Sequence, residues 1–251
     1  MDYGIQMYSL RDVTQKDLKG SLAAVADMGY KLVEFAGFFG HSAADVRGWL
    51  DEYGLTVSGT HTGREELADD VFDATVAYHK AIGNRCIIIP GADLTTAAKL
   101  DAFIDFVNRV QPKLAAEGIR LGYHNHSHEF LPNEDGLIIH TELEKRTSLL
   151  FEIDTYWAYN AGLDPVALLE RLADRIPVIH LKDGVSARSG RYEDQEGKPL
   201  GMGTAPVAAV RRAAIRLGMD MVVESESLTP DGPTEAKICI DYLKQLDRAD
   251  G

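Results

Sequence analysis

Four apolar segments in the second half of the chain each end close to a side chain that can bind a metal or transfer a proton. These side chains are His124, Asp154, His180 and Glu224. An apolar run of this length predicts a strand buried on both faces, so polar residues gathered at its carboxyl end need a separate reason. Two imidazoles and two carboxylates form a mixed nitrogen and oxygen set that suits Mn²⁺, Zn²⁺ or Co²⁺ better than Ca²⁺. The segments therefore predict one divalent metal ion held by these four residues.

The alternation of side chains along a strand agrees with a shared site. Residues two apart on a strand face the same way, so His126 follows His124 and Lys182 follows His180 on the inner face. His126 and Lys182 are therefore candidates for a proton shuttle or for a partner of a substrate oxygen. The alternative is that they are exposed loop residues. The competing interpretation of the metal residues is four isolated polar caps, each satisfied by nearby backbone. Isolated caps would not be expected at the same end of four consecutive strands, so the shared placement favours the metal site.

Further candidates face the other half of the same opening. Glu34 and His61 end the second and third predicted strands, and Tyr8 lies on the first. They are candidates for binding substrate hydroxyls, and a hydrogen-bonded rim is the alternative for each. Trp157 is a candidate wall against which a sugar ring packs, with an ordinary core aromatic as the alternative.

Glu152 shares a face with Asp154 and lies one inward position deeper on the same predicted strand. A buried carboxylate is costly unless it is paired. We therefore expect Glu152 to pair with a cation, Lys182 or Arg120, rather than to act as a catalyst.

The elements that must bring these residues together are predicted by recurring apolar runs. Eight strand-like runs alternate with helical patterns such as 16–28 and 100–114, whose apolar side chains recur at helical spacing. Several helical patterns end in a glycine directly before the next strand, the expected left-handed cap. Eight such units in 251 residues predict one α/β domain over 1–251, a (β/α)8 TIM barrel with all strand ends opening onto one face. The strand-like runs cover residues 4–8, 31–36, 55–60, 85–90, 119–124, 148–154, 177–181 and 219–224, and the glycines are Gly29, Gly54, Gly83, Gly118 and Gly218.

The longest irregular stretch covers residues 184–204, after the seventh predicted strand, and is rich in glycine and charge. Long connections in compact domains are often functional lids. We expect this one to lie over the pocket.

The composition limits the partners. A formal charge of −13 disfavours nucleic acid and anionic membranes, because both are normally bound through basic patches. No apolar run approaches the roughly 18 residues of a membrane span, and strand-like sequence from Gly4 leaves no room for a signal peptide. We expect a soluble, cytoplasmic protein, with a homo-oligomer left open.

At these motifs the chain resembles the xylose isomerase-like TIM-barrel superfamily, which includes sugar phosphate isomerases/epimerases and the apurinic endonuclease family 2 group. The resemblance runs nearly end to end, and Tyr123-His124-Asn125-His126 and His180-Leu181-Lys182-Asp183 are among its motifs. The family metal is typically held by Glu, Asp, His and Glu from the fifth to eighth strands. By position, the resemblance implies His124, Asp154, His180 and Glu224 as ligands.

The departure from the family pattern is His124, which stands where the fifth strand usually carries glutamate. In ketose 3-epimerases that glutamate and its eighth-strand counterpart are the two acid–base groups. The resemblance then makes His126 the candidate replacement base. A zinc-cluster endonuclease is a poor match, because Trp157 stands where a histidine is expected and the Asp-x-His pair after the seventh strand is missing.

Together with these residues, the resemblance implies a metal-dependent isomerase or epimerase that acts on a small-molecule sugar and abstracts a proton next to a carbonyl to form an enediolate. Glu224 or His126 would take the proton, and Lys182 would stabilise or reprotonate an oxygen. The main alternative is a metal-dependent lyase, of the inosose-dehydratase or keto-glycoside elimination type. A third interpretation is a sugar-binding module without catalysis.

Overall fold

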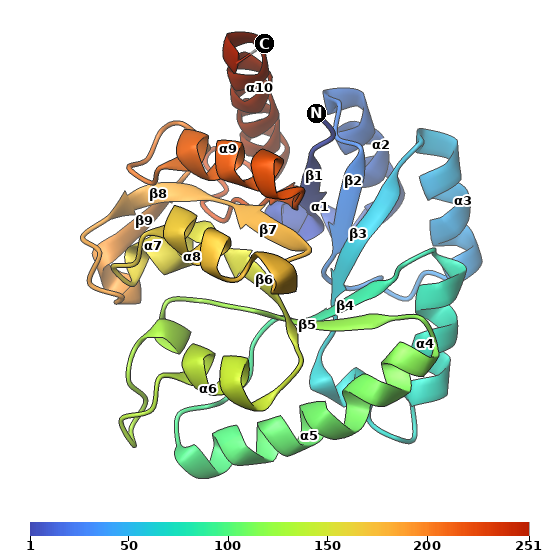
Figure 1. Cartoon of the computed structure of the whole chain (residues 1–251). Helices are drawn as coiled ribbons and strands as arrows, with labels where there is room; N and C mark the ends of the chain where they lie inside the picture. The colour runs from blue at the N-terminus through green and yellow to red at the C-terminus, as the bar shows by residue number, and fades with distance from the viewer. Residues whose placement is uncertain (251) are drawn as a thin grey trace.

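The computed structural model describes residues 1–250, and their central feature is a closed barrel of eight parallel strands (Figure 1). The strands follow one another around the barrel in chain order, since each pairs in parallel with its neighbours and β1 closes the ring against β10. This confirms the predicted (β/α)8 TIM barrel. The barrel strands are β1 Gly4–Gln6, β2 Leu32–Phe35, β3 Thr56–His61, β4 Cys86–Ile89, β5 Arg120–His124, β6 Leu150–Asp154, β7 Val178–Leu181 and β10 Asp220–Val223.

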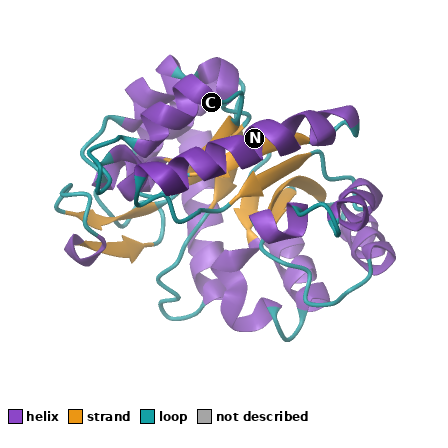
Figure 2. Cartoon of the chain, turned by 90° about the horizontal axis from the view of Figure 1, so that it is seen from below, coloured by secondary structure: helices purple, strands orange, loops and turns teal. Residues whose placement is uncertain are grey.

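Helices surround the barrel and bury its outer face (Figure 2). Their ends match the sequence signals, because Ser42 and Thr96 accept backbone N–H groups at the starts of α3 and α5. All five glycines predicted to follow helices have positive φ, which a side chain would make costly. The helices are α1 Arg11–Thr14, α2 Leu18–Met28, α3 Ala43–Tyr53, α4 Phe72–Ala81, α5 Ala97–Ala116, α6 Ile139–Arg146, α7 Thr155–Asn160, α8 Pro165–Arg171, α9 Val207–Leu217 and α10 Gly232–Asp250.

The barrel interior has its own small apolar cluster, formed by Cys86, Ile88, Val178 and Val222. Val178 and Val222 lie two residues before His180 and Glu224, so this cluster forms the layer beneath the polar strand ends. Gly59 makes room for it, because an added Cβ would lie 2.8 Å from the Ile88 side chain. The polar side chains therefore rest on a packed apolar floor.

Two local expectations are wrong. The first strand ends at Gln6 rather than at Tyr8, and a 3-10 turn, Met7–Leu10, follows. The Gln6 side chain accepts the N–H of Tyr8, which turns the chain away from the strand direction.

The stretch 184–204 is not irregular throughout. It contains most of a two-stranded antiparallel hairpin, β8 Asp183–Ser186 and β9 Gln195–Lys198, which projects to one side of the barrel (Figure 2). Asp183 anchors its base by accepting backbone N–H groups from Gly201 and Gly203. Within residues 1–250, no helix combines the length and the apolar character needed to cross a membrane.

Candidate functional site

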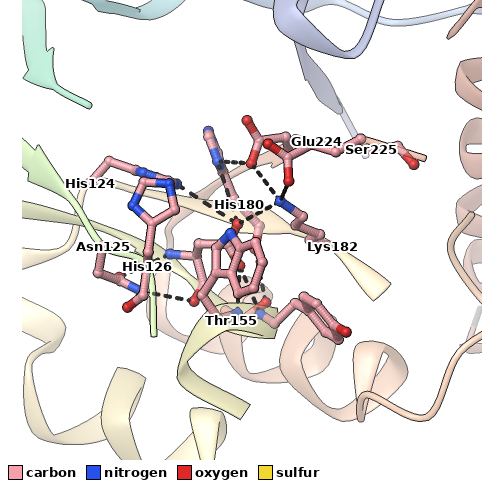
Figure 3. A network of polar contacts seen from close by, with 12 residues as sticks. His124, Asn125, His126, Thr155, His180, Lys182, Glu224 and Ser225 are labelled. Carbon is pink, nitrogen blue, oxygen red and sulfur yellow. Dashed lines mark hydrogen bonds and ion pairs between the residues drawn. The ribbon is translucent and has the colours of Figure 1, made fainter. Parts of the chain in front are cut away.

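The side chains of His124, His180 and Glu224 converge at the carboxyl ends of their strands (Figure 3). Asp154 completes the group, which we call the mouth cluster. One ligand atom from each lies within 4.8 Å of the others. His180 Nδ1 is 3.3 Å from Glu224 Oε2 and 4.0 Å from Asp154 Oδ2, and His124 Nε2 is 3.8 Å from Asp154 Oδ2. The structure thus brings together all four predicted metal ligands.

The atoms of the mouth cluster that could bind a metal are buried, and several of them have no hydrogen-bond partner. Both ring nitrogens of His124, Oδ2 of Asp154 and Nδ1 of His180 lack a hydrogen bond. Buried polar atoms are ordinarily paired, so several unpaired ones facing a common point need an explanation. Their donor types and their convergence fit a divalent cation.

Neighbouring groups aim Asp154 into the cluster. Its Oδ1 accepts the N–H groups of Tyr156 and Trp157, both at 2.9 Å, which leaves Oδ2 free. Asn125 bridges β5 and β6, because its side chain accepts from Asp154 N–H and donates to the Asp154 carbonyl. Burial raises the pKa of Asp154 to about 6, with Lys182 opposing the shift.

Lys182 lies beside the mouth cluster but is enclosed by acidic groups. Its Nζ is 3.2 Å from Glu224 Oε2 and 3.8 Å from Asp154 Oδ2, and it also bonds Glu226. Burial opposes the charged form, yet these carboxylates raise its pKa, so the ammonium stays charged. The ammonium also lies 4.6 Å from the ring centroid of Trp157.

His126 follows β5 and is held by its backbone. Its N–H donates to Oε2 of Glu129 at 2.8 Å, and Glu129 also accepts the hydroxyl of Tyr123. Burial, with His124 adding to it, lowers the pKa of His126 to about 4. The ring is therefore neutral near pH 7 and can accept a proton. No pattern in the sequence predicts a role for Glu129, because that role depends on the turn after β5.

Glu34 and His61 lie deeper than expected. Glu34 is fully buried and accepts a hydrogen bond from Gln6, while His61 Nε2 lies 3.0 Å from Glu34 Oε1 and 2.7 Å from Glu152 Oε2. The predicted pairing of Glu152 with Lys182 or Arg120 is therefore wrong, because histidines reach it first. Burial opposes protonation of His61, but Glu34 and Glu152 raise its pKa to about 10.

A cavity of about 490 Å³ opens above the mouth cluster. The predicted residues Tyr8, His61 and His126 line it, whereas Glu34 and Trp157 are not among its lining residues. Glu34 therefore does not reach the expected substrate position, since other side chains cover it. The lining residues are Tyr8, Ala36, Gly37, Phe38, His61, Thr62, Glu66, Pro90, His124, His126, Glu224 and Glu226. Phe38, Glu66 and Glu226 were not among the predicted site residues.

Trp157 lines a second, smaller cavity of about 270 Å³, and His126 borders both cavities. Tyr192, from the turn of the β8–β9 hairpin, stacks on Trp157 with ring centroids 5.9 Å apart. The hairpin turn therefore borders this second cavity, and its residues are not among those that line the larger one.

Comparison with known proteins agrees with this architecture. A family model described as xylose isomerase-like TIM barrel matches residues 22–246. The inosose dehydratase of Geobacillus kaustophilus is 25% identical over 186 residues, which are 64% of this chain. The chain matches 60% of the length of that relative.

Solved structures extend the similarity over the whole barrel. A sugar phosphate isomerase/epimerase from Parabacteroides distasonis has a TM-score of 0.81 and 26% identity, with 97% of each chain covered. An L-ribulose 3-epimerase has a TM-score of 0.72 and 18% identity, covering 100% of this chain and 97% of its own, and it shows the fold alone.

Proposed function

Because the chain belongs to the xylose isomerase-like TIM-barrel family, we propose that it is a divalent-metal-dependent sugar isomerase or epimerase. The observation that carries the proposal is the mouth cluster, whose four donors converge with unpaired buried atoms directly below a cavity. His124, Asp154, His180 and Glu224 hold the cation. When bound, a cation at this place polarises a substrate carbonyl and stabilises negative charge that develops on its oxygen.

The proton acceptors are His126 and Glu224, which both face the cavity. His126 is neutral near pH 7, because its pKa is about 4, and its position is fixed by Glu129. A positioned base of this kind removes a proton bound to carbon next to the carbonyl. Lys182 is charged and buried, so it acts on Glu224 and Asp154 rather than as a first contact for substrate.

The lining of the cavity supports an uncharged sugar as substrate. Glu66, Glu224 and Glu226 contribute carboxylates, and none of the described lining residues is lysine or arginine. Of the nearby cations, Lys182 is already paired with carboxylates, and Arg11 donates to the backbone carbonyls of Tyr8 and Glu226. A phosphate dianion would meet repulsion here, while sugar hydroxyls can donate to the carboxylates.

A lyase is the second candidate, and one observation favours it. The smaller cavity with Trp157 and Tyr192 meets the larger one at His126, the proposed base. A leaving group on the carbon adjacent to the one that loses its proton would fit there, against the aromatic rings of Trp157 and Tyr192. The dehydratase named among the relatives agrees with such an elimination.

Proton NMR in D₂O tests both candidates on Mn²⁺-loaded protein. Unphosphorylated ketoses and 3-keto-glycosides are offered together with the phosphorylated form of each ketose. Exchange at carbon with every substituent retained supports the isomerase or epimerase, and loss of a substituent supports the lyase. Binding of a sugar by metal-loaded protein without exchange or elimination would overturn both and leave a sugar-binding module.

A further inference from the structure

We propose that the barrel binds a second divalent cation below the first, between Glu34, His61, Glu152 and His180, which we call the deep cluster. One ligand atom of each residue lies within 4.8 Å of the others. Glu34 lies on β2, His61 on β3, Glu152 on β6 and His180 on β7, so the site spans the barrel interior. The proposal concerns ion binding only and does not require the reaction proposed above.

The deep donors lie at hydrogen-bond distance from one another, slightly closer together than the ligands of a four-coordinate ion. His180 Nε2 is 3.1 Å from Glu34 Oε1 and 3.3 Å from Glu152 Oε2, and His61 Nε2 is 3.0 and 2.7 Å from the same two oxygens. Ligands about 2.0–2.1 Å from a tetrahedral Zn²⁺ are roughly 3.3 Å from one another. The imidazole and carboxylate set is one that Zn²⁺ or Co²⁺ accepts.

Burial of the carboxylates adds a second, independent observation. Glu34 and Glu152 are 0% and 1% exposed, and Oε2 of Glu34 and Oε1 of Glu152 have no hydrogen-bond partner. Gln6 donates to the other oxygen of Glu34 and is itself fixed by the N–H of Tyr8. Such outer contacts orient a ligand. His61 is the deep residue that lines the cavity, and so provides the route of entry.

His180 connects the two clusters through the two sides of one ring. Its Nδ1 faces Glu224 and Asp154 in the mouth cluster, and its Nε2 faces Glu34 and Glu152 in the deep cluster. An imidazole that has lost both ring protons can bind one cation on each nitrogen. The two ions would then bind with mutual dependence, because they share this ligand.

The charge of the buried region also favours a second ion. Five carboxylates surround the single ammonium of Lys182 and the histidines, namely Glu34, Glu152, Asp154, Glu224 and Glu226. With His61 and His124 neutral and His180 as the shared imidazolate, five negative charges remain, and two divalent cations reduce them to one. Uncompensated buried charge is costly. A proton on His61 is the competing way to reduce the charge.

Counting bound zinc on the full chain tests the second site. Protein stripped with chelator is reloaded with Zn²⁺, freed of excess ion and analysed by mass spectrometry for zinc per chain. We expect two ions in the wild type and one in Glu152→Gln, which keeps the size but removes the charge. His61→Asn should also bind one ion, so that the result does not depend on the folding of one variant.

Two controls separate this proposal from the proposed function. Glu235→Gln changes a fully buried carboxylate outside both clusters, one that bonds Ser227 and Leu228, and should keep two ions. His124→Ala should lose the mouth ion and keep the deep one. One ion in the wild type that persists in Glu152→Gln and His61→Asn but is lost in His124→Ala would overturn the second site and leave the proposed function intact. Loss of zinc binding only in Glu152→Gln and His61→Asn would instead contradict the mouth site.

Discussion

The mouth and deep clusters have the same donor types but differ in access. Each contains two histidines and two carboxylates, and His180 belongs to both. His124 and Glu224 of the mouth cluster line the cavity, whereas Glu34 and Glu152 are closed off from it. On β6 the difference amounts to two residues, since Asp154 lies at the mouth and Glu152 one inward position below. Depth along a strand therefore separates Glu34 and Glu152 from the cavity, although His61 of the deep cluster still lines it.

The largest effect should come from removing a ligand of the mouth cluster. His124→Ala takes away one imidazole and opens the donor set, so turnover should fall about 10³-fold or more, equivalent to several kcal/mol of transition-state stabilisation. Turnover by NMR and metal content should fall together. His41→Ala, outside both clusters and the lining of the cavity, is the matched control and should retain both. Full activity in metal-free His124→Ala would contradict the mouth site.

A smaller loss should follow from changing the proposed base without touching the cation. His126→Gln keeps a polar side chain above the mouth cluster but cannot serve as a base, so exchange should fall about 10²- to 10⁴-fold. Its metal content should equal that of the wild type. A parallel loss of metal would mean that His126 acts as a ligand instead.

The deep cluster should have a weaker influence on turnover. Glu152→Gln removes a carboxylate behind His180, and changes behind a metal ligand typically reduce metal affinity or activity about 10- to 100-fold. The loss should be visible as weaker binding of the mouth ion in a titration with Mn²⁺. A loss of turnover as large as that of His124→Ala would show that a buried carboxylate of the deep cluster matters as much as a ligand of the mouth cluster.

The last expected effect is on stability rather than on turnover, and its sign depends on pH. Burial raises the pKa of Asp154 to about 6 in the fold, above its value of about 3.9 in the unfolded chain. The folded carboxyl thus holds its proton more tightly, and the corresponding stability is present below about pH 4 and lost as the pH rises through about 6.

Asp154→Asn removes this loss, because an amide stays neutral and its oxygen can still accept the N–H groups at the start of α7. In chelator, the variant should exceed the wild type by up to about 3 kcal/mol in free energy of unfolding at neutral pH and match it near pH 4. Urea unfolding at both pH values measures this, with Asp174→Asn as an exposed control. A less stable variant at neutral pH would show that the carboxylate is not strained in the metal-free fold.

The sequence predicted the mouth cluster well because its information is local to each strand. Apolar runs predict the strands, and the alternation of side chains along a strand predicts that His124, Asp154 and His180 face inward. The barrel topology then brings them together. The resemblance pointed to the same residues.

The deep cluster escaped prediction because it depends on distances across the barrel. The alternation of side chains predicts that Glu152 faces inward. Nothing in the sequence shows that His61 reaches across from β3, so that its Nε2 lies 2.7 Å from Glu152 Oε2. The β8–β9 hairpin was missed for a related reason. Its strands have four residues each and are rich in glycine and charge, so their pairing depends on anchors such as Asp183 rather than on apolar alternation.

Anomalous X-ray diffraction from crystals of Mn²⁺-loaded protein tests the central claim most directly. We predict a strong peak bonded to His124, Asp154, His180 Nδ1 and Glu224, within about 2.0–2.3 Å of each donor. Catalytically active crystals without a peak among these four side chains would contradict the account.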